Sequence, residues 1–78
     1  MNVIEKKAKL ADLIEEYIAN SNKESELLSY IAELREDPDF NDKKLFKDIF
    51  DELMNDLPNL PRKYLKQIAA IIRDFNDF

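Results

Sequence analysis

The sequence predicts an all-α fold, a small compact bundle of four short helices in which neighbours run antiparallel. Hydrophobic residues recur with the 3.6-residue period of a helix through most of the chain. Glycine, on which tight β-hairpins and phosphate-binding loops depend, is absent from all 78 residues. The connections between periodic stretches are short, about two to six residues, which favours antiparallel neighbours. We expect one domain spanning residues 1–78.

The strongest helix signal lies at residues 41–57. Its apolar residues share one half of the helical wheel: Leu45, Phe46, Ile49, Phe50, Leu53, Met54 and Leu57. We expect Asp39 or Asn41 to cap its start. Pro58 and Pro61 end it, because proline lacks the amide donor and clashes with the preceding turn.

Two helices are predicted before this one, over residues 3–20 and 22–36. The first has an apolar face of Val3, Leu10, Ile14, Tyr17 and Ile18. Lys7 points into the middle of that face, and we expect it to extend its ammonium to solvent from a frayed first turn. Ser21 and Glu24 have the spacing of a capping box for the second helix. The apolar stripe of that helix is Leu27, Leu28, Ile31 and Leu34.

The fourth helix is predicted over residues 61–75, with Asn59 as its cap and Pro61 in its first turn. Its expected core face is Tyr64, Leu65, Ile68, Ile71, Ile72 and Phe75. Arg62, Lys66 and Arg73 are expected outside, with the small Ala69 between them.

The composition excludes most catalytic chemistry. The chain has no Cys and no His, so it has no thiolate, no disulfide and neither of the side chains most used as general base or transition-metal ligand. The spacing of four residues partly matches that of a calcium-binding loop: Asp37, Asp39, Asn41 and Asp48. Asp42, however, occupies the position at which that loop needs Gly. We therefore expect no enzyme activity, no metal and no cofactor.

A cytoplasmic location is expected. The longest apolar run, Ile68–Ile72, is far too short to span a membrane, and acidic residues interrupt the only stretch that could serve as a secretory signal.

The net charge of −5 is unevenly distributed. Residues 24–56 hold eleven acidic and four basic side chains, whereas residues 57–78 hold four basic and two acidic ones. Direct binding to nucleic acid needs clustered Lys and Arg, so the acidic centre argues against it. The same centre suits a protein partner with a basic surface, or serves only solubility.

An acidic stripe on the second helix is the candidate partner-binding site. It consists of Glu26, Tyr30, Glu33 and Asp37, extended by Glu36 and Asp39. In this interpretation Tyr30 is an aromatic anchor among acids; the alternative is a plain solvated face. The basic residues Arg62, Lys66 and Arg73 either pair with acids of a neighbouring helix, lie in solvent, or bind an acidic surface. They are too few to predict a DNA-binding helix-turn-helix.

The function predicted from these patterns is that of a non-enzymatic, acidic protein-binding module. It would inhibit another protein by occupying a basic surface, as immunity, antitoxin and anti-defence proteins do. The segment Leu57–Pro61 is similar to the Leu-Pro step before the last helix of bacteriocin immunity proteins, a step too common at helix corners to assign the family. The alternative is a self-associating structural or regulatory domain, in which Leu13, Met54 and Phe78 seal a homodimer.

Overall fold

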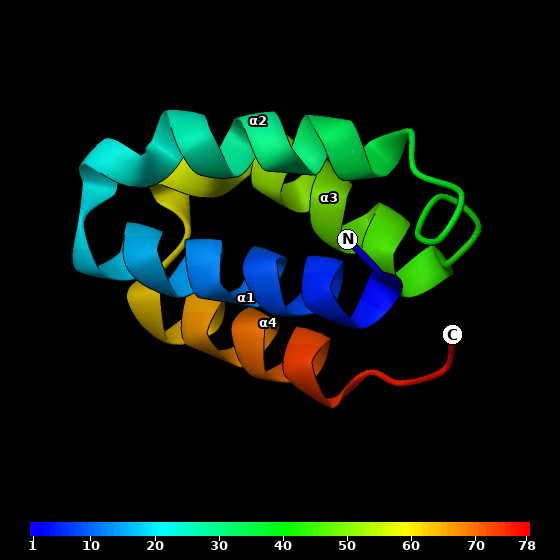
Figure 1. Cartoon of the computed structure of the whole chain (residues 1–78). Coiled ribbons are helices and arrows are strands. Elements are labelled where there is room, and N and C mark those ends of the chain that lie inside the picture. Colours follow the sequence, from blue (N-terminus) through cyan, green and yellow to red (C-terminus); the bar gives the residue numbers. More distant parts are fainter.

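The computed structural model describes all 78 residues and contains four α-helices and two short 3-10 helices. In chain order these are α1 (Val3–Ala19), η1 (Ser21–Lys23), α2 (Glu24–Arg35), α3 (Lys44–Asp56), η2 (Leu57–Asn59) and α4 (Arg62–Asp74). Consecutive helices run in opposite directions, and both chain ends lie at the end of the bundle that holds the α2–α3 loop (Figure 1). The all-α bundle with antiparallel neighbours is therefore confirmed.

The link between α1 and α2 differs from the predicted capping box. Asn20 leaves α1 in an extended conformation, and its side chain accepts a hydrogen bond from the Asn22 amide at 3.0 Å. Ser21 lies inside η1, where its backbone carbonyl accepts from the Glu24 amide. The capping box fails because the Glu24 amide, from which the Ser21 hydroxyl would accept, donates to the Ser21 backbone carbonyl instead.

The helix starts at α3 and α4 also differ from expectation. Asp39 and Asn41 lie in a run of turns, and α3 begins only at Lys44, with no side-chain cap. Asn59 belongs to η2, and Pro61 holds the cap position of α4 with no side-chain hydrogen bond. Only the start of α1 has a conventional cap, in which the Asn2 side chain accepts from the Glu5 amide at 2.9 Å.

The core consists of 18 buried residues, all hydrophobic, drawn from all four helices, from η2 and from the α2–α3 loop. From α3 it takes Phe46, Ile49, Phe50 and Leu53, which confirms the apolar arc, although Met54 is 38 % exposed. Phe40 from the loop is fully buried, and its ring packs edge-on against Phe46 with centroids 4.9 Å apart. Each fully buried side chain of this size contributes roughly 1.5–3 kcal/mol.

α1 and α4, the first and last helices, pack against each other most extensively and lie side by side in Figure 1. The buried face of α4 is Leu65, Ile68, Ala69 and Ile72. The prediction that Ala69 lies outside is therefore wrong, and so is the placement of Tyr64 and Ile71, which are 37 % and 47 % exposed. The buried arc of α4 is therefore centred on Leu65 and Ile72, and Tyr64 and Ile71 lie at its margin.

Polar contacts also connect α1 with α4. The Arg73 guanidinium lies 2.6 Å from Asp12 and 2.5 Å from Glu15 of α1, which confirms that this base pairs with acids of a neighbouring helix. The two carboxylates raise the pKa of Arg73. The Lys7 ammonium donates to the backbone carbonyls of Arg73 at 2.8 Å and Phe75 at 2.6 Å. The expectation that Lys7 simply reaches solvent is wrong, because its ammonium caps the backbone carbonyls at the C-terminal end of α4.

None of the helices has both the length and the apolar character needed to cross a membrane.

Candidate functional site

The predicted acidic stripe separates into four environments, and Tyr30 occupies the first of them, the core. Its side chain is 7 % exposed, and its hydroxyl donates to the Lys6 carbonyl at 3.5 Å. The prediction of a protruding aromatic anchor is therefore wrong. Tyr30 follows Leu27 by three residues and precedes Leu34 by four, so it shares their buried face.

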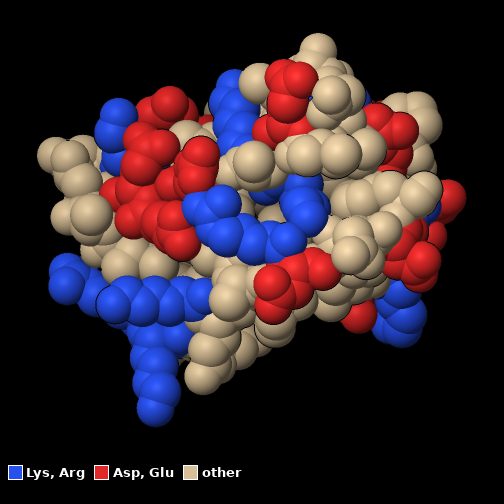
Figure 2. Space-filling model, turned by 60° about the horizontal axis from the view of Figure 1, so that its bottom comes forward, with Lys and Arg blue, Asp and Glu red and all other residues tan.

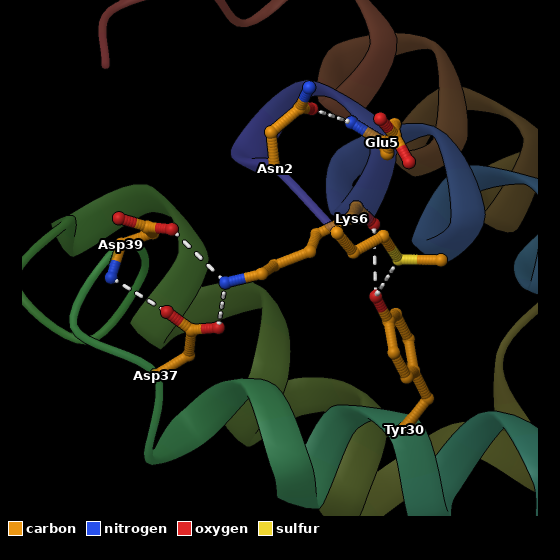
Figure 3. Close-up of polar contacts among 7 residues, drawn as sticks. Asn2, Glu5, Lys6, Tyr30, Asp37 and Asp39 are labelled. Atoms are coloured by element: carbon orange, nitrogen blue, oxygen red, sulfur yellow. Dashed lines mark hydrogen bonds and ion pairs between the residues drawn. The ribbon is translucent and has the colours of Figure 1, made fainter.

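Asp37 and Asp39 occupy the second environment, an internal ion pair. Both carboxylates contact the Lys6 ammonium of α1, at 2.5 Å and 3.1 Å, as Figure 3 shows. The other Asp37 oxygen accepts from the Asp39 amide at 2.9 Å. Hydrogen bonding to Lys6 holds the pKa of Asp37 below its ordinary value, and hydrogen bonding to Asp37 raises the pKa of Lys6.

These two acids therefore attach the start of α1 to the α2–α3 loop, and they are not a free docking surface as predicted. They are also the first two residues of the partial match to a calcium-binding loop, and an ammonium lies where such a loop would place a cation. No group of three or more acidic side chains is arranged to hold a metal ion.

Glu26 and Glu33 remain exposed, and they share a groove between α1 and α2. The groove has a volume of about 240 Å³. Its lining residues are Lys9 and Leu13 from α1 and Glu26, Ser29, Tyr30 and Glu33 from α2. We call this the α1–α2 groove. The two glutamates are separated by about 10 Å along the helix axis, since each residue rises 1.5 Å.

The chemistry of the α1–α2 groove favours a cation. Glu33 makes no ion pair, and Glu26 has only Lys23 at 3.4 Å. The Lys9 ammonium lies 4.5 Å from the centroid of the Tyr30 ring, which shows that a cation fits over that aromatic face. Burial and, next, the charge of Glu33 raise the pKa of Tyr30, so its hydroxyl stays neutral at physiological pH. The groove can hold a basic side chain between an aromatic ring and two carboxylates.

Glu36 occupies the fourth environment, apart from the α1–α2 groove. It lines a hollow of about 280 Å³ between the end of α2 and α3, with Arg35, Asn41, Lys47, Phe50 and Asp51. Arg35 and Asp51 pair there at 3.1 Å. Two basic and two acidic residues line this hollow, so their charges balance and it offers no preference for a basic partner.

The predicted basic residues of α4 also separate. Arg73 pairs with α1, whereas Arg62 and Lys66 are exposed. The exposed Lys63 lies beside Arg62 at the start of the helix, and sequence reasoning missed it. In Figure 2, basic side chains project from the lower left of the molecule, the end at which α4 begins. The sequence does contain a pattern that indicates this basic cluster: two adjacent basic residues follow Pro61, and no acidic residue occurs before Asp74.

One of the three residues proposed for a homodimer contact is buried in its own chain. Leu13 is 3 % exposed, so it is part of the core and not an unused margin. Phe78 packs edge-on against Phe40 with centroids 5.3 Å apart but is 42 % exposed, and Met54 is also exposed. Self-association itself stays a prediction.

Comparison with known proteins gives no relative: no family model matches the chain, and no similar protein was found among curated proteins or solved structures.

Proposed function

We propose that this protein is a non-enzymatic binding module that uses the α1–α2 groove to occupy a basic surface of another protein. Its biological class is that of immunity, antitoxin and anti-defence inhibitors, acting in the cytoplasm. One observation carries the proposal: Glu26 and Glu33 lie in one groove with the Tyr30 ring, over which a cation already sits.

The physical case rests on what a partner arginine or lysine gains in the groove. Its cation replaces Lys9 over the Tyr30 ring, and its hydrogen bonds go to the carboxylate of Glu26 or Glu33. An arginine suits the site best, since a planar guanidinium stacks on an aromatic ring and pairs with a carboxylate through two donors. The net charge of −5 adds long-range attraction toward a basic surface, which raises the association rate.

The role of Lys9 gives the proposal a sharp consequence. Lys9 competes with the incoming cation for the same ring face, so its removal strengthens binding while leaving the core untouched. If this face serves only solubility, Lys9→Ala gains no more than Lys47→Ala, which removes an exposed lysine outside the groove.

The test begins with affinity capture from the native host, followed by measurement of Kd for the captured partner. The double variant Glu26→Gln/Glu33→Gln is expected to weaken binding about tenfold, which corresponds to roughly 1.4 kcal/mol. Lys9→Ala is expected to strengthen it. The matched control is Glu5→Gln/Glu16→Gln, which removes two exposed acids of α1 outside the groove. Equal losses in the two double variants would show that only total charge matters and would refute the groove as the site.

Self-association is the second candidate, favoured by the exposed Ile71 and Tyr64 on α4. Light scattering over a hundredfold range of concentration distinguishes it. A strict monomer contradicts this alternative.

A further inference from the structure

The end of the bundle where α4 begins carries basic side chains without acidic partners. Arg62, Lys63 and Lys66 are exposed, and none of them makes an ion pair, whereas six other basic residues do. We call these three residues the basic end.

The basic end does not contribute to the stability of its own helix. The start of a helix carries a positive partial charge, so acids are favoured there and bases are disfavoured. α1 and α2 follow this rule, with acidic residues in their first turns; α3 also lacks an acid there, but its first-turn Lys44 pairs with Asp48. The first turn of α4 has no acid and no side-chain cap. A locally unfavourable arrangement that nothing in the folded chain compensates points to a role in binding.

A pocket of about 170 Å³ adjoins the basic end, and four of its seven lining residues are hydrophobic. It forms where η1 and η2 bring the end of α1 close to the start of α4, and its lining residues are Tyr17, Ile18, Ser21, Pro58, Leu60, Arg62 and Leu65. A cavity of about 150 Å³ accepts a molecule as large as benzene. The pocket therefore has room for one aliphatic side chain. Arg62 belongs to both features, so the pocket and the positive charge are continuous.

We propose that this end of the molecule binds an acidic segment of a partner protein. An aliphatic side chain of that segment enters the pocket, and carboxylates on either side of it pair with Arg62, Lys63 and Lys66. Charge complementarity selects the occupant, because these bases have no intramolecular acid. A nucleic acid strand is the weaker fit, since its phosphates leave the pocket empty. This surface is separate from the α1–α2 groove and opposite in sign.

The first test is a nuclear magnetic resonance titration of the full, ¹⁵N-labelled chain. The probe is an acetylated and amidated peptide with one central leucine flanked on each side by three glutamates. We expect saturable shifts confined to the first two turns of α4 and to the pocket residues, and a loss of affinity of at least about fivefold when the leucine is replaced by serine. Equal affinity of the serine peptide, or the absence of saturable shifts, overturns the proposal. Tighter binding of a twelve-nucleotide thymidine strand at the same amides and ionic strength also overturns it, in favour of nucleic acid.

Charge-reversal variants provide the second test. Lys63→Glu/Lys66→Glu is expected to weaken peptide binding at least tenfold while raising Tm, because acids are favoured near a helix start. The matched control is Lys44→Glu/Lys47→Glu, which has the same spacing at the start of α3 and is expected to change peptide affinity less than threefold. An unchanged affinity in the first variant, or a fall in its Tm, shows that these lysines are structural and refutes the proposal. Neither result bears on binding through the α1–α2 groove, so the two proposals fail independently.

Discussion

Replacing Lys7 with methionine isolates the contact that closes the carboxyl end of α4. Methionine keeps an unbranched side chain of similar length, so the packing of the stem is preserved while the ammonium is lost. The two hydrogen bonds to the carbonyls of Arg73 and Phe75 disappear with it. The favourable interaction of a cation with the negative end of the helix is lost as well.

The expected destabilisation is about 1–2 kcal/mol. A hydrogen bond from a charged donor contributes roughly 1.5–3 kcal/mol in protected sites, and a cation at a helix end contributes roughly 0.3–1 kcal/mol. Both figures must be reduced here, because the contact with Arg73 is exposed and water can replace the ammonium. For a domain of this size, 1 kcal/mol corresponds to about 4–8 °C in Tm. We therefore expect Tm to fall by about 4–16 °C.

The assay is thermal unfolding followed by circular dichroism, with Lys66→Met as the matched control. Both substitutions change the net charge equally, but Lys66 is exposed and makes no ion pair, so the control is expected to stay within about 0.5 kcal/mol of the parent protein. Hydrogen exchange adds a local readout, since the Phe75 amide, which donates to Ile71 in the last turn of α4, is expected to exchange faster in Lys7→Met. The same Tm in both variants would refute the role assigned to Lys7.

Two further predictions concern the contacts of α1 with the α2–α3 loop and with α4. The pKa of Asp37 is lowered in the folded protein, so its contribution to stability is present above its ordinary value of 3.8 and is lost as pH falls through the lower folded value. Asp37→Asn is therefore expected to lower Tm at pH 6, with the difference from the parent shrinking below about pH 4; a difference independent of pH would contradict this. Ala69→Leu is expected to cost about 1–3 kcal/mol in urea unfolding, because it forces α1 and α4 apart. The exposed neighbour Ala70→Leu is the control, and equal losses in both variants would show that close approach at Ala69 is unimportant.

The helices could be predicted from the sequence because their signal is periodic and is repeated over many residues. The predicted helix 41–57 has seven apolar positions on one face. Met54 is exposed and not buried as predicted, but the other positions still identify the face that packs against the core. The ends depend on single hydrogen bonds and were less predictable. Ser21 and Asn20 are both suitable caps, and only the extended backbone at Asn20 decides between them.

The candidate site was harder to predict, because its side chains contact residues that are distant in the sequence. Hydrophobic periodicity does not show which helices approach each other or how closely. Tyr30 lies between the apolar face and the acidic flank of α2, and the Lys6 carbonyl, from a distant part of the chain, gives its hydroxyl a partner. The ion pairs of Asp37 and Asp39 with Lys6 could not be predicted for the same reason: their partner is 31 and 33 residues away. What the sequence did indicate was that Glu26 and Glu33 lie on one flank, since seven residues make two turns of a helix.

The extensive pairing of α1 with α4 sets the order in which this chain can fold during synthesis. α1 leaves the ribosome first, but the helix that covers most of its apolar face is made last. Until residues 62–74 have emerged, Leu10 and Ile14 cannot reach their native environment. The apolar face of α1 therefore stays partly uncovered until the fourth helix is released, and native packing is completed only then.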